Sequence, residues 1–175
     1  MLLDLTRYRQ PQSSFARTFQ PEDVVGEGDA YEIVAPCELA FEVYKDKDRF
    51  RLEGRVKSEL ELLCSRCLEA FRLPVDTAFD LRYLPSSEAA SASDHEVPDD
   101  DLETSYYREG QIDLNELMRE QFYLALPMKP LCRIDCRGLC VQCGTNLNSG
   151  SCSCAPAWED PRLATLRELR QTHES

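Results

Sequence analysis

The sequence has 175 residues, 42% hydrophobic and 30% charged, a balance typical of a globular domain rather than a disordered or fibrous chain. Its 32 acidic and 20 basic residues give a net charge of −12, which disfavours a surface that binds nucleic acid as a whole. The first residues lack the apolar core of a signal peptide, and no run approaches the roughly 20 apolar residues of a membrane span. We therefore expect a cytoplasmic protein that does not enter a membrane.

Residues 1–29 contain scattered prolines and glycines, and we predict an irregular segment with two short strands, around Leu2–Leu5 and Phe15–Phe19. Across residues 30–84 apolar side chains occupy every second position, with a polar interruption at KDKD (45–48). This period of two predicts three long antiparallel strands, each with one apolar and one charged face. The apolar face requires a cover, which helices must supply.

Residues 85–109 interrupt the alternation. The stretch PSSEAASASDHEVPDDDLET contains acidic residues but no lysine or arginine, and few large apolar groups that could offset the entropy of ordering it. We predict a mobile acidic loop, as a solvated insertion or, alternatively, as a partner-binding segment.

Residues 110–175 are predicted to contain a helix, a cysteine-rich zinc knuckle and a C-terminal helix that packs on the sheet. Asp113 is placed as the N-cap of the first helix, and Pro127 ends it. Its apolar stripe comprises Leu114, Leu117, Met118, Phe122 and Ala125. Asp160-Pro161 starts the second helix. The expected fold is one α+β domain: an antiparallel β-sheet of long hairpin strands covered by one or two helices, with the knuckle near the C-terminus.

Two C-x-x-C pairs stand out among the nine cysteines. Cys64 and Cys67 lie between two predicted strands, and Cys140 and Cys143 precede a glycine. Two residues between thiolates let both sulfurs bind one Zn²⁺ from a tight turn. A redox pair would be expected to open a helix, whereas a strand pattern follows the first pair and turn residues follow the second. Reduced cytosolic thiols also disfavour disulfides.

Cys37 falls on the apolar face of its strand and is interpreted as a core residue. Eight cysteines then remain as candidate metal ligands: Cys140, Cys143, Cys132, Cys136, Cys152, Cys154, Cys64 and Cys67. They suffice for two four-thiolate sites. Alternatively, the six C-terminal cysteines could supply one site alone, from Cys140, Cys143 and two of the other four. Cys64 and Cys67 could also join two C-terminal cysteines, and the sequence leaves these partitions open. A site closed by four thiolates indicates structural zinc, one ion or two.

Catalysis has little support in the sequence. The only histidines, His95 and His173, lie in the acidic loop and at the C-terminus, and neither is placed as a base. No nucleophile–base set or nucleotide loop is evident. We predict a protein that is not an enzyme and has no small-molecule substrate, with a thiol-redox or metal-dependent enzyme as the alternative.

The motifs occur in a specific order: CSRCLEAF, the acidic loop, DLNELMREQFYLALPMKPLC, GLCVQCGTNLN, C-x-C and DPRLATLRELR. From about Tyr31 to Arg170 this order resembles the bacterial YceD family of large ribosomal RNA subunit accumulation proteins. The resemblance implies a ribosome biogenesis factor that promotes synthesis, processing or accumulation of large-subunit (23S) rRNA. It implies as partner the pre-ribosomal large-subunit particle, through its rRNA, a basic ribosomal protein or both.

Two forms of that role are open. In one, local cations contact RNA: Arg51, Arg55 and Lys57 on a strand, or Arg133 and Arg137 beside the thiols. Acidic neighbours make a solvated face the simpler interpretation of the strand cations. In the other, the chain is an acidic, chaperone-like binder of a basic large-subunit ribosomal protein, attracted by the negative field.

Overall fold

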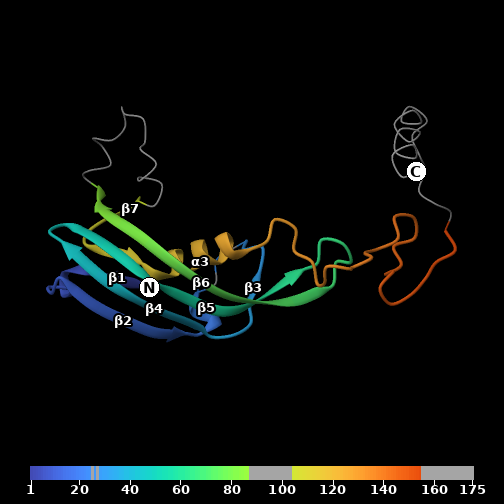
Figure 1. Ribbon diagram of the computed structural model, residues 1–175, viewed down its shortest axis with the longest axis horizontal. Helices are drawn as coiled ribbons and strands as arrows, with labels where there is room; N and C mark the ends of the chain where they lie inside the picture. Colours follow the sequence, from blue (N-terminus) through green and yellow to red (C-terminus); the bar gives the residue numbers. More distant parts are fainter. Residues whose placement is uncertain (25, 27, 87–103, 155–175) are drawn as a thin grey trace, which may run out of the picture. The chain divides into compact units, whose positions relative to one another are not determined.

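A computed structural model describes residues 1–24, 26, 28–86 and 104–154 (Figure 1). This part of the chain is mostly β-sheet with few helices, an α+β arrangement. The helix predicted from Asp160, both histidines and most of the predicted acidic loop lie outside the described residues. Within them, no helix has the length and apolarity needed to cross a bilayer.

Among the described residues, the helical elements with stated bounds are the 3₁₀ turn η1 (Leu5–Arg7) and the α-helices α1 (Pro21–Val24) and α3 (Leu114–Ala125). The strands are β1 (Leu2–Asp4), β2 (Gln12–Phe19), β3 (Glu32–Ile33), β4 (Cys37–Asp46), β5 (Arg49–Leu63), β6 (Ala70–Pro85), β7 (Thr104–Tyr107) and β8 (Gln111–Asp113).

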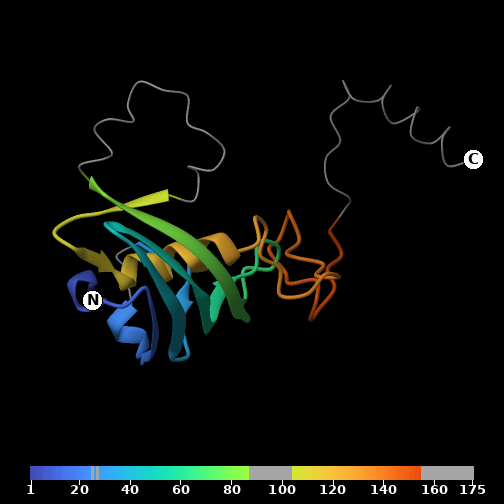
Figure 2. The same cartoon turned by 60° about the vertical axis from the view of Figure 1, so that its left-hand side comes forward.

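The main sheet has the strand order β2-β4-β5-β6-β7, with β3 paired to β5, while β1 and β8 form a separate two-stranded sheet. All pairs are antiparallel except β6–β7, which is parallel. Figure 2 shows β7 beside β6 at the edge of the sheet. Strands therefore occupy both ends of the 85–109 interval expected to be a loop, since β6 extends to Pro85 and β7 starts at Thr104.

The β5–β6 hairpin dominates the sheet, with 15 residues in β5 and 16 in β6. Apolar residues of β5 such as Leu52, Val56 and Leu60 are fully buried, whereas Glu53, Arg55 and Lys57 point to the charged face. Adjacent side chains of a strand point to opposite faces, so the sequence alternation becomes one core face and one solvated face.

The first of the three predicted long strands is divided in the structure. β3 pairs Ile33 with Leu60, and β4 pairs Glu38 with Lys57, so the register on β5 changes between them. Pro36 lies in this gap and has no N–H to donate to a ladder. The Ser58 hydroxyl instead donates to the Ala35 carbonyl at 3.0 Å. The apolar alternation continues across the gap, so the sequence pattern alone conceals the break.

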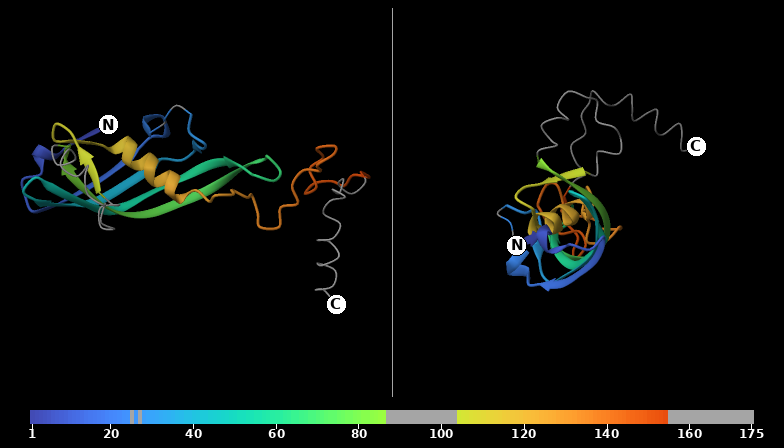
Figure 3. Two further views of the ribbon diagram at one scale, coloured as in Figure 1. Left: turned by 90° about the horizontal axis from the view of Figure 1, so that it is seen from above. Right: turned by 90° about the vertical axis from the view of Figure 1, so that its left-hand side faces the viewer.

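Helix α3 covers the concave side of the curved sheet, as the end-on view in Figure 3 shows. Asp113 caps it as predicted, its carboxylate accepting from the Asn115 N–H at 2.9 Å. Leu117, Met118 and Phe122 are at most 1% exposed and belong to the same core as the apolar residues of β4 and β5. The helix ends at Ala125, before Pro127, as expected.

The chain divides into two compact units, each described by itself. The first comprises Met1–Cys64 and Glu69–Cys132 and contains the main sheet, α3 and the apolar core. The second comprises Ser65–Leu68 and the chain from Arg133, described as far as Cys154. Its described residues form turns with one isolated antiparallel bridge, between Leu139 and Asn146.

Candidate metal centres

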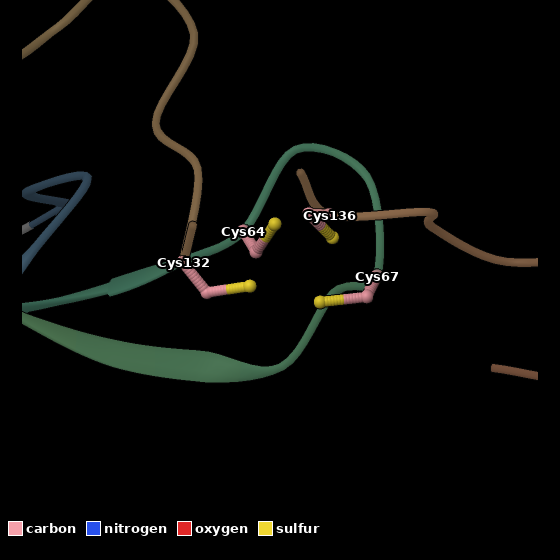
Figure 4. Close-up of side chains that lie close together, drawn as sticks. All are labelled: Cys64, Cys67, Cys132 and Cys136. Atoms are coloured by element: carbon pink, nitrogen blue, oxygen red, sulfur yellow. The ribbon is translucent and has the colours of Figure 1, made fainter. Parts of the chain in front are cut away.

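Four cysteines from two distant stretches of sequence form the first tetrad: Cys64, Cys67, Cys132 and Cys136. Their four Sγ atoms all lie within 4.8 Å of one another. Figure 4 shows the sulfurs pointing toward a common centre, two from the tip of the β5–β6 hairpin and two from the segment after α3. Cys64, Cys67 and Cys136 are at most 3% exposed, and Cys132 is half-buried.

The hairpin tip is a tight turn that directs two of these sulfurs. The Cys64 N–H donates to the Glu69 carbonyl at 2.9 Å, and Leu68 has a left-handed φ of 60°. A bulky residue rarely adopts this conformation, so surrounding contacts must impose it. The apolar Leu68 side chain is nevertheless 62% exposed. Leu68 is thus held in a strained backbone conformation in the turn that brings the sulfurs of Cys64 and Cys67 together.

Arg66 connects this turn to the loop that contains Cys136. Its guanidinium donates to the Cys136 carbonyl at 2.8 Å, and its own carbonyl accepts from the Leu139 N–H at 3.1 Å. Gly138, with φ 74°, has space for no more than a hydrogen, because a Cβ there would lie 2.9 Å from the Arg66 carbonyl oxygen. The glycine in C-R-G-L-C is therefore required both by its conformation and by this close approach.

Asn148 organises the loop on the other side. Its side-chain N–H donates to the Cys136 sulfur at 3.3 Å, and its Oδ1 accepts from the Arg137 N–H at 2.8 Å. The same Oδ1 accepts from Arg133 at 2.8 Å. Hydrogen bonds of this kind orient a ligand sulfur and stabilise its anionic form.

The second tetrad comprises Cys140, Cys143, Cys152 and Cys154, whose Sγ atoms also lie within 4.8 Å of one another. A short hairpin carries the first two: the Cys140 N–H donates to the Thr145 carbonyl at 2.8 Å, and the Gly144 N–H donates to the Cys140 carbonyl at 2.9 Å. Gly144 has φ 73°, as expected for the turn after C-x-x-C. Three of these four cysteines are exposed and Cys140 is half-buried.

Polar groups around the second tetrad act on its thiols. The backbone N–H groups of Cys143 and Gln142 lower the pKa of Cys140. The Thr145 hydroxyl, 3.2 Å from the Cys143 sulfur, leads the contacts that lower the pKa of Cys143 to about 6. In contrast, interaction with Cys143 raises the pKa of Cys154 to about 12. Four sulfurs this close cannot all be thiolates unless a cation shares the site.

Both tetrads pass a simple test of fit for a tetrahedral metal ion. Four thiolates around Zn²⁺, with Zn–S distances of about 2.3 Å, place sulfurs about 3.8 Å apart. The observed upper limit of 4.8 Å requires only small rotations to reach that arrangement. None of the nine cysteines, all within the described part of the chain, forms a disulfide. The two clusters can therefore hold metal ions.

The structure brings the eight candidate cysteines together in one of the groupings that the sequence left open. All eight candidate ligands fall into two groups of four, with the Cys64–Cys67 pair joined by Cys132 and Cys136. Cys37 lies fully buried in the apolar core, as predicted, and burial raises the pKa of its thiol. No sequence motif singled out Asn148, Thr145 or Arg66 as neighbours of the thiols, although the first two lie in the unusual GTNLN segment.

The strand cations considered as RNA contacts are paired with carboxylates. Arg55 and Lys57 both approach Asp76, at 3.2 and 3.5 Å, and Arg51 makes two hydrogen bonds to Asp80. Arg133 lies 3.5 Å from Asp135 and also bonds Asn148. This pattern favours the solvated-face interpretation for Arg55 and Lys57.

Comparison with known proteins gives the family context of these clusters. Residues 52–170 match the family described as large ribosomal RNA subunit accumulation protein YceD. A protein of Arabidopsis thaliana named large ribosomal RNA subunit accumulation protein YCED homolog 1, chloroplastic, is 27% identical over 78% of this chain and 49% of its own length. Its namesake in Zea mays is 28% identical over 69% of this chain and 49% of its own.

An uncharacterized protein of Mycobacterium tuberculosis is 38% identical over 61% of this chain and 48% of its own length. The chain thus spans about half the length of the curated relatives it matches. No solved structure matches it.

Proposed function

Because this chain belongs to the YceD family of large ribosomal RNA subunit accumulation proteins, we propose that it is a ribosome biogenesis factor. In this role it promotes synthesis, processing or accumulation of large-subunit (23S) rRNA in the cytoplasm, on the pre-ribosomal large-subunit particle. The observation that carries the proposal is the family match over residues 52–170, supported by relatives whose names state rRNA accumulation.

The proposed role is not enzymatic. The two cysteine tetrads each offer a metal ion four sulfurs, which leaves no open position for water or substrate. We assign one structural zinc ion to each, with Cys64, Cys67, Cys132 and Cys136 as ligands of the first and Cys140, Cys143, Cys152 and Cys154 as ligands of the second. Thiolate sulfur is a soft ligand that suits zinc and disfavours magnesium or calcium.

Gene deletion in the source organism tests the rRNA role. The ratio of 23S to 16S rRNA, measured by electrophoresis of total RNA, should fall in the deletion strain and recover when the wild-type gene is supplied in trans. An unchanged ratio, together with an unchanged ribosome profile, would refute the proposal.

Metal analysis separates the structural role from the enzymatic alternative. Purified protein should contain two zinc ions per chain, and its tetrad thiols should react with a thiol reagent only after chelation. A metal-free protein with one hyper-reactive thiol would instead favour a thiol-redox enzyme.

One observation favours a second form of the role, the binding of a basic ribosomal protein. A cavity of about 630 Å³ near β7, β8 and α3 is lined by four acidic residues, Glu109, Asp113, Glu116 and Glu120, and by one basic residue, Arg108. Asp113 already accepts from the N-terminal ammonium and caps α3, so the other three carboxylates are the ones available. Burial, with the nearby Glu116, raises the pKa of Glu120. Tyr83, 6% exposed, also lines this cavity. Carboxylates beside tyrosine rings suit a lysine or arginine side chain.

Isothermal titration with a lysine-rich peptide tests this second form. Binding should weaken in the Glu116→Gln, Glu120→Gln double variant and persist in Glu22→Gln, a control on α1 outside the residues that line the cavity. Equal binding by all three proteins would argue against it.

A further inference from the structure

A second cavity, of about 550 Å³, lies where β4, β5 and β6 meet near the β4–β5 turn, and its charge is opposite to that of the whole chain. Four cationic side chains line it, against one carboxylate, Asp46. The cations are Lys45, Arg49, Arg51 and Arg82. A concentration of positive charge on a chain of net charge −12 requires a physical explanation.

Strand register produces this concentration. Tyr44 of β4 lies opposite Arg51 of β5, and Arg51 lies opposite Arg82 of β6. The three side chains therefore form a row across the solvated face, an aromatic ring followed by two guanidinium groups. Like charges directly opposite each other in a sheet are destabilising, so the arrangement costs stability in the isolated protein.

Only part of this charge is balanced internally. Arg51 is held by two hydrogen bonds to Asp80 and lies 5.9 Å from the centre of the Tyr44 ring. Arg82 is exposed, and it makes no hydrogen bond or ion pair within the described residues. Its charge nevertheless acts on Asp80, whose pKa is lowered chiefly by Arg51 and to a lesser extent by Arg82. Arg55 and Lys57, on the same face, share Asp76. Arg51 and Arg82 therefore share one carboxylate, and the hydrogen bonds of that carboxylate go to Arg51, so the charge of Arg82 at the cavity is the less fully balanced.

The cavity also offers apolar surface. Besides Tyr44, its lining includes Leu84. Phe50 also borders the cavity, but it is only 6% exposed and belongs to the apolar core. On a sheet surface, an aromatic ring can stack against a nucleobase while a neighbouring arginine binds the phosphate of the same nucleotide. A folded protein segment would require a larger surface, and a basic one would be repelled.

We propose that this cavity binds single-stranded RNA, with a base against Tyr44 and phosphates on Arg82 and Arg49. The inference rests on the proposed function for its biological setting, and it names RNA rather than protein as the ligand at this face. Arg51, already bonded to Asp80, positions the Tyr44 ring and adds to the local field.

Fluorescence anisotropy with a labelled 12-nucleotide RNA of mixed sequence tests the proposal on the 175-residue chain purified in the presence of zinc. The wild type should bind, and the Arg49→Ala, Arg82→Ala double variant should bind about tenfold or more weakly. If both phosphate contacts are lost, the slope of log K against log salt should fall by about 1.4. Tyr44→Ala should lower the affinity by at least about fivefold.

Arg55→Ala is the matched control, since it removes one arginine of the same face from an existing ion pair. It should retain wild-type affinity, and all variants should retain the wild-type circular dichroism spectrum. Absence of RNA binding by the wild type, equal affinity of the double variant, or equal loss in the control would each overturn the assignment. So would preferential capture of a lysine-rich peptide by this cavity.

The in vivo assay distinguishes failure of this inference from failure of the proposed function. If deletion lowers the 23S to 16S ratio and the double variant restores it fully, the family role stands and this RNA site is rejected. If the variant fails to restore the ratio although it is expressed and folded, the site is supported. If deletion leaves the ratio unchanged while the purified chain binds RNA through this cavity, the proposed function is rejected instead.

Discussion

The two cysteine tetrads have the same ligands but opposite surroundings. In the first, three of four cysteines are at most 3% exposed, and two of them flank the tip of the longest hairpin. In the second, three of four are exposed, and the surrounding structure is a short turn with one bridge. In a segment without an apolar core, such as the one around the second tetrad, the free energy of metal binding can supply the free energy of folding. Two sites with the same four thiol ligands can therefore contribute differently to stability, the first beside the end of the main sheet and the second within a short turn.

The largest effect should follow from removing ligands of the first tetrad. Cys64→Ser combined with Cys67→Ser should release one of two zinc ions and lower the melting temperature by about 10 °C or more, because buried polar groups lose their metal partner. Calorimetry and elemental analysis of the same sample measure both. A variant that keeps two zinc ions would show that these sulfurs are not ligands.

A smaller effect on melting should follow from the second tetrad. Cys140→Ser with Cys143→Ser should also release one zinc ion, but the main transition should shift by only about 3 °C or less, since these residues lie outside the apolar core. If the two double variants melt alike, the contrast between the tetrads is mistaken.

A chelator added to the wild type should remove zinc from the two tetrads at different rates. With excess chelator, one zinc ion should leave in a fast phase, from the exposed second tetrad, and the other in a slow phase. The fast phase should be absent from the Cys140→Ser, Cys143→Ser variant. Release in one phase, at one rate, would contradict the difference in exposure.

A subtler change tests the hydrogen bond to a ligand. Asn148→Ala removes the side-chain N–H that lies 3.3 Å from the Cys136 sulfur, and zinc affinity of the first tetrad should fall about tenfold. Competition with a chromophoric chelator measures this change. Asn115→Ala, which alters an amide on α3 instead, should leave the affinity unchanged.

The smallest effect on metal content should come from the ninth cysteine. Cys37→Ala should retain both zinc ions while lowering stability by about 1–2 kcal/mol, because it removes a buried sulfur from the core. Loss of zinc in this variant would mean that unfolding, rather than ligand removal, releases metal in the other variants too.

Much of the fold could be predicted because its signals are local. The alternation of apolar and polar residues predicted the three regions of strand, and Asp113 and Pro127 predicted the two ends of α3. The register change near Pro36 was missed, since the alternation persists through it. β7 was missed because its four residues adjoin an acidic stretch, and its partner β6 ends about 20 residues earlier in the chain.

The sites were predictable only in part, for a similar reason. C-x-x-C spacing identifies two sulfurs that can share a metal, but it carries no information about which distant pair completes each tetrad. That information lies in chain topology, as does the row of Tyr44, Arg51 and Arg82, whose members are paired by strand register rather than by sequence distance. From the sequence, Arg51 was considered as an RNA contact, whereas Tyr44 and Arg82 were not.

The paired length of the β5–β6 hairpin has a consequence for how this chain tolerates insertions. Its strands are paired from Phe50 with Tyr83 to Leu63 with Ala70, directly before the turn of Cys64 and Cys67. One extra residue in each strand would turn the first thiol to the opposite face, and two would carry the pair about 7 Å farther along the ribbon. An exposed hairpin is usually free to vary in length, but this one must keep its residue count for four sulfurs to meet.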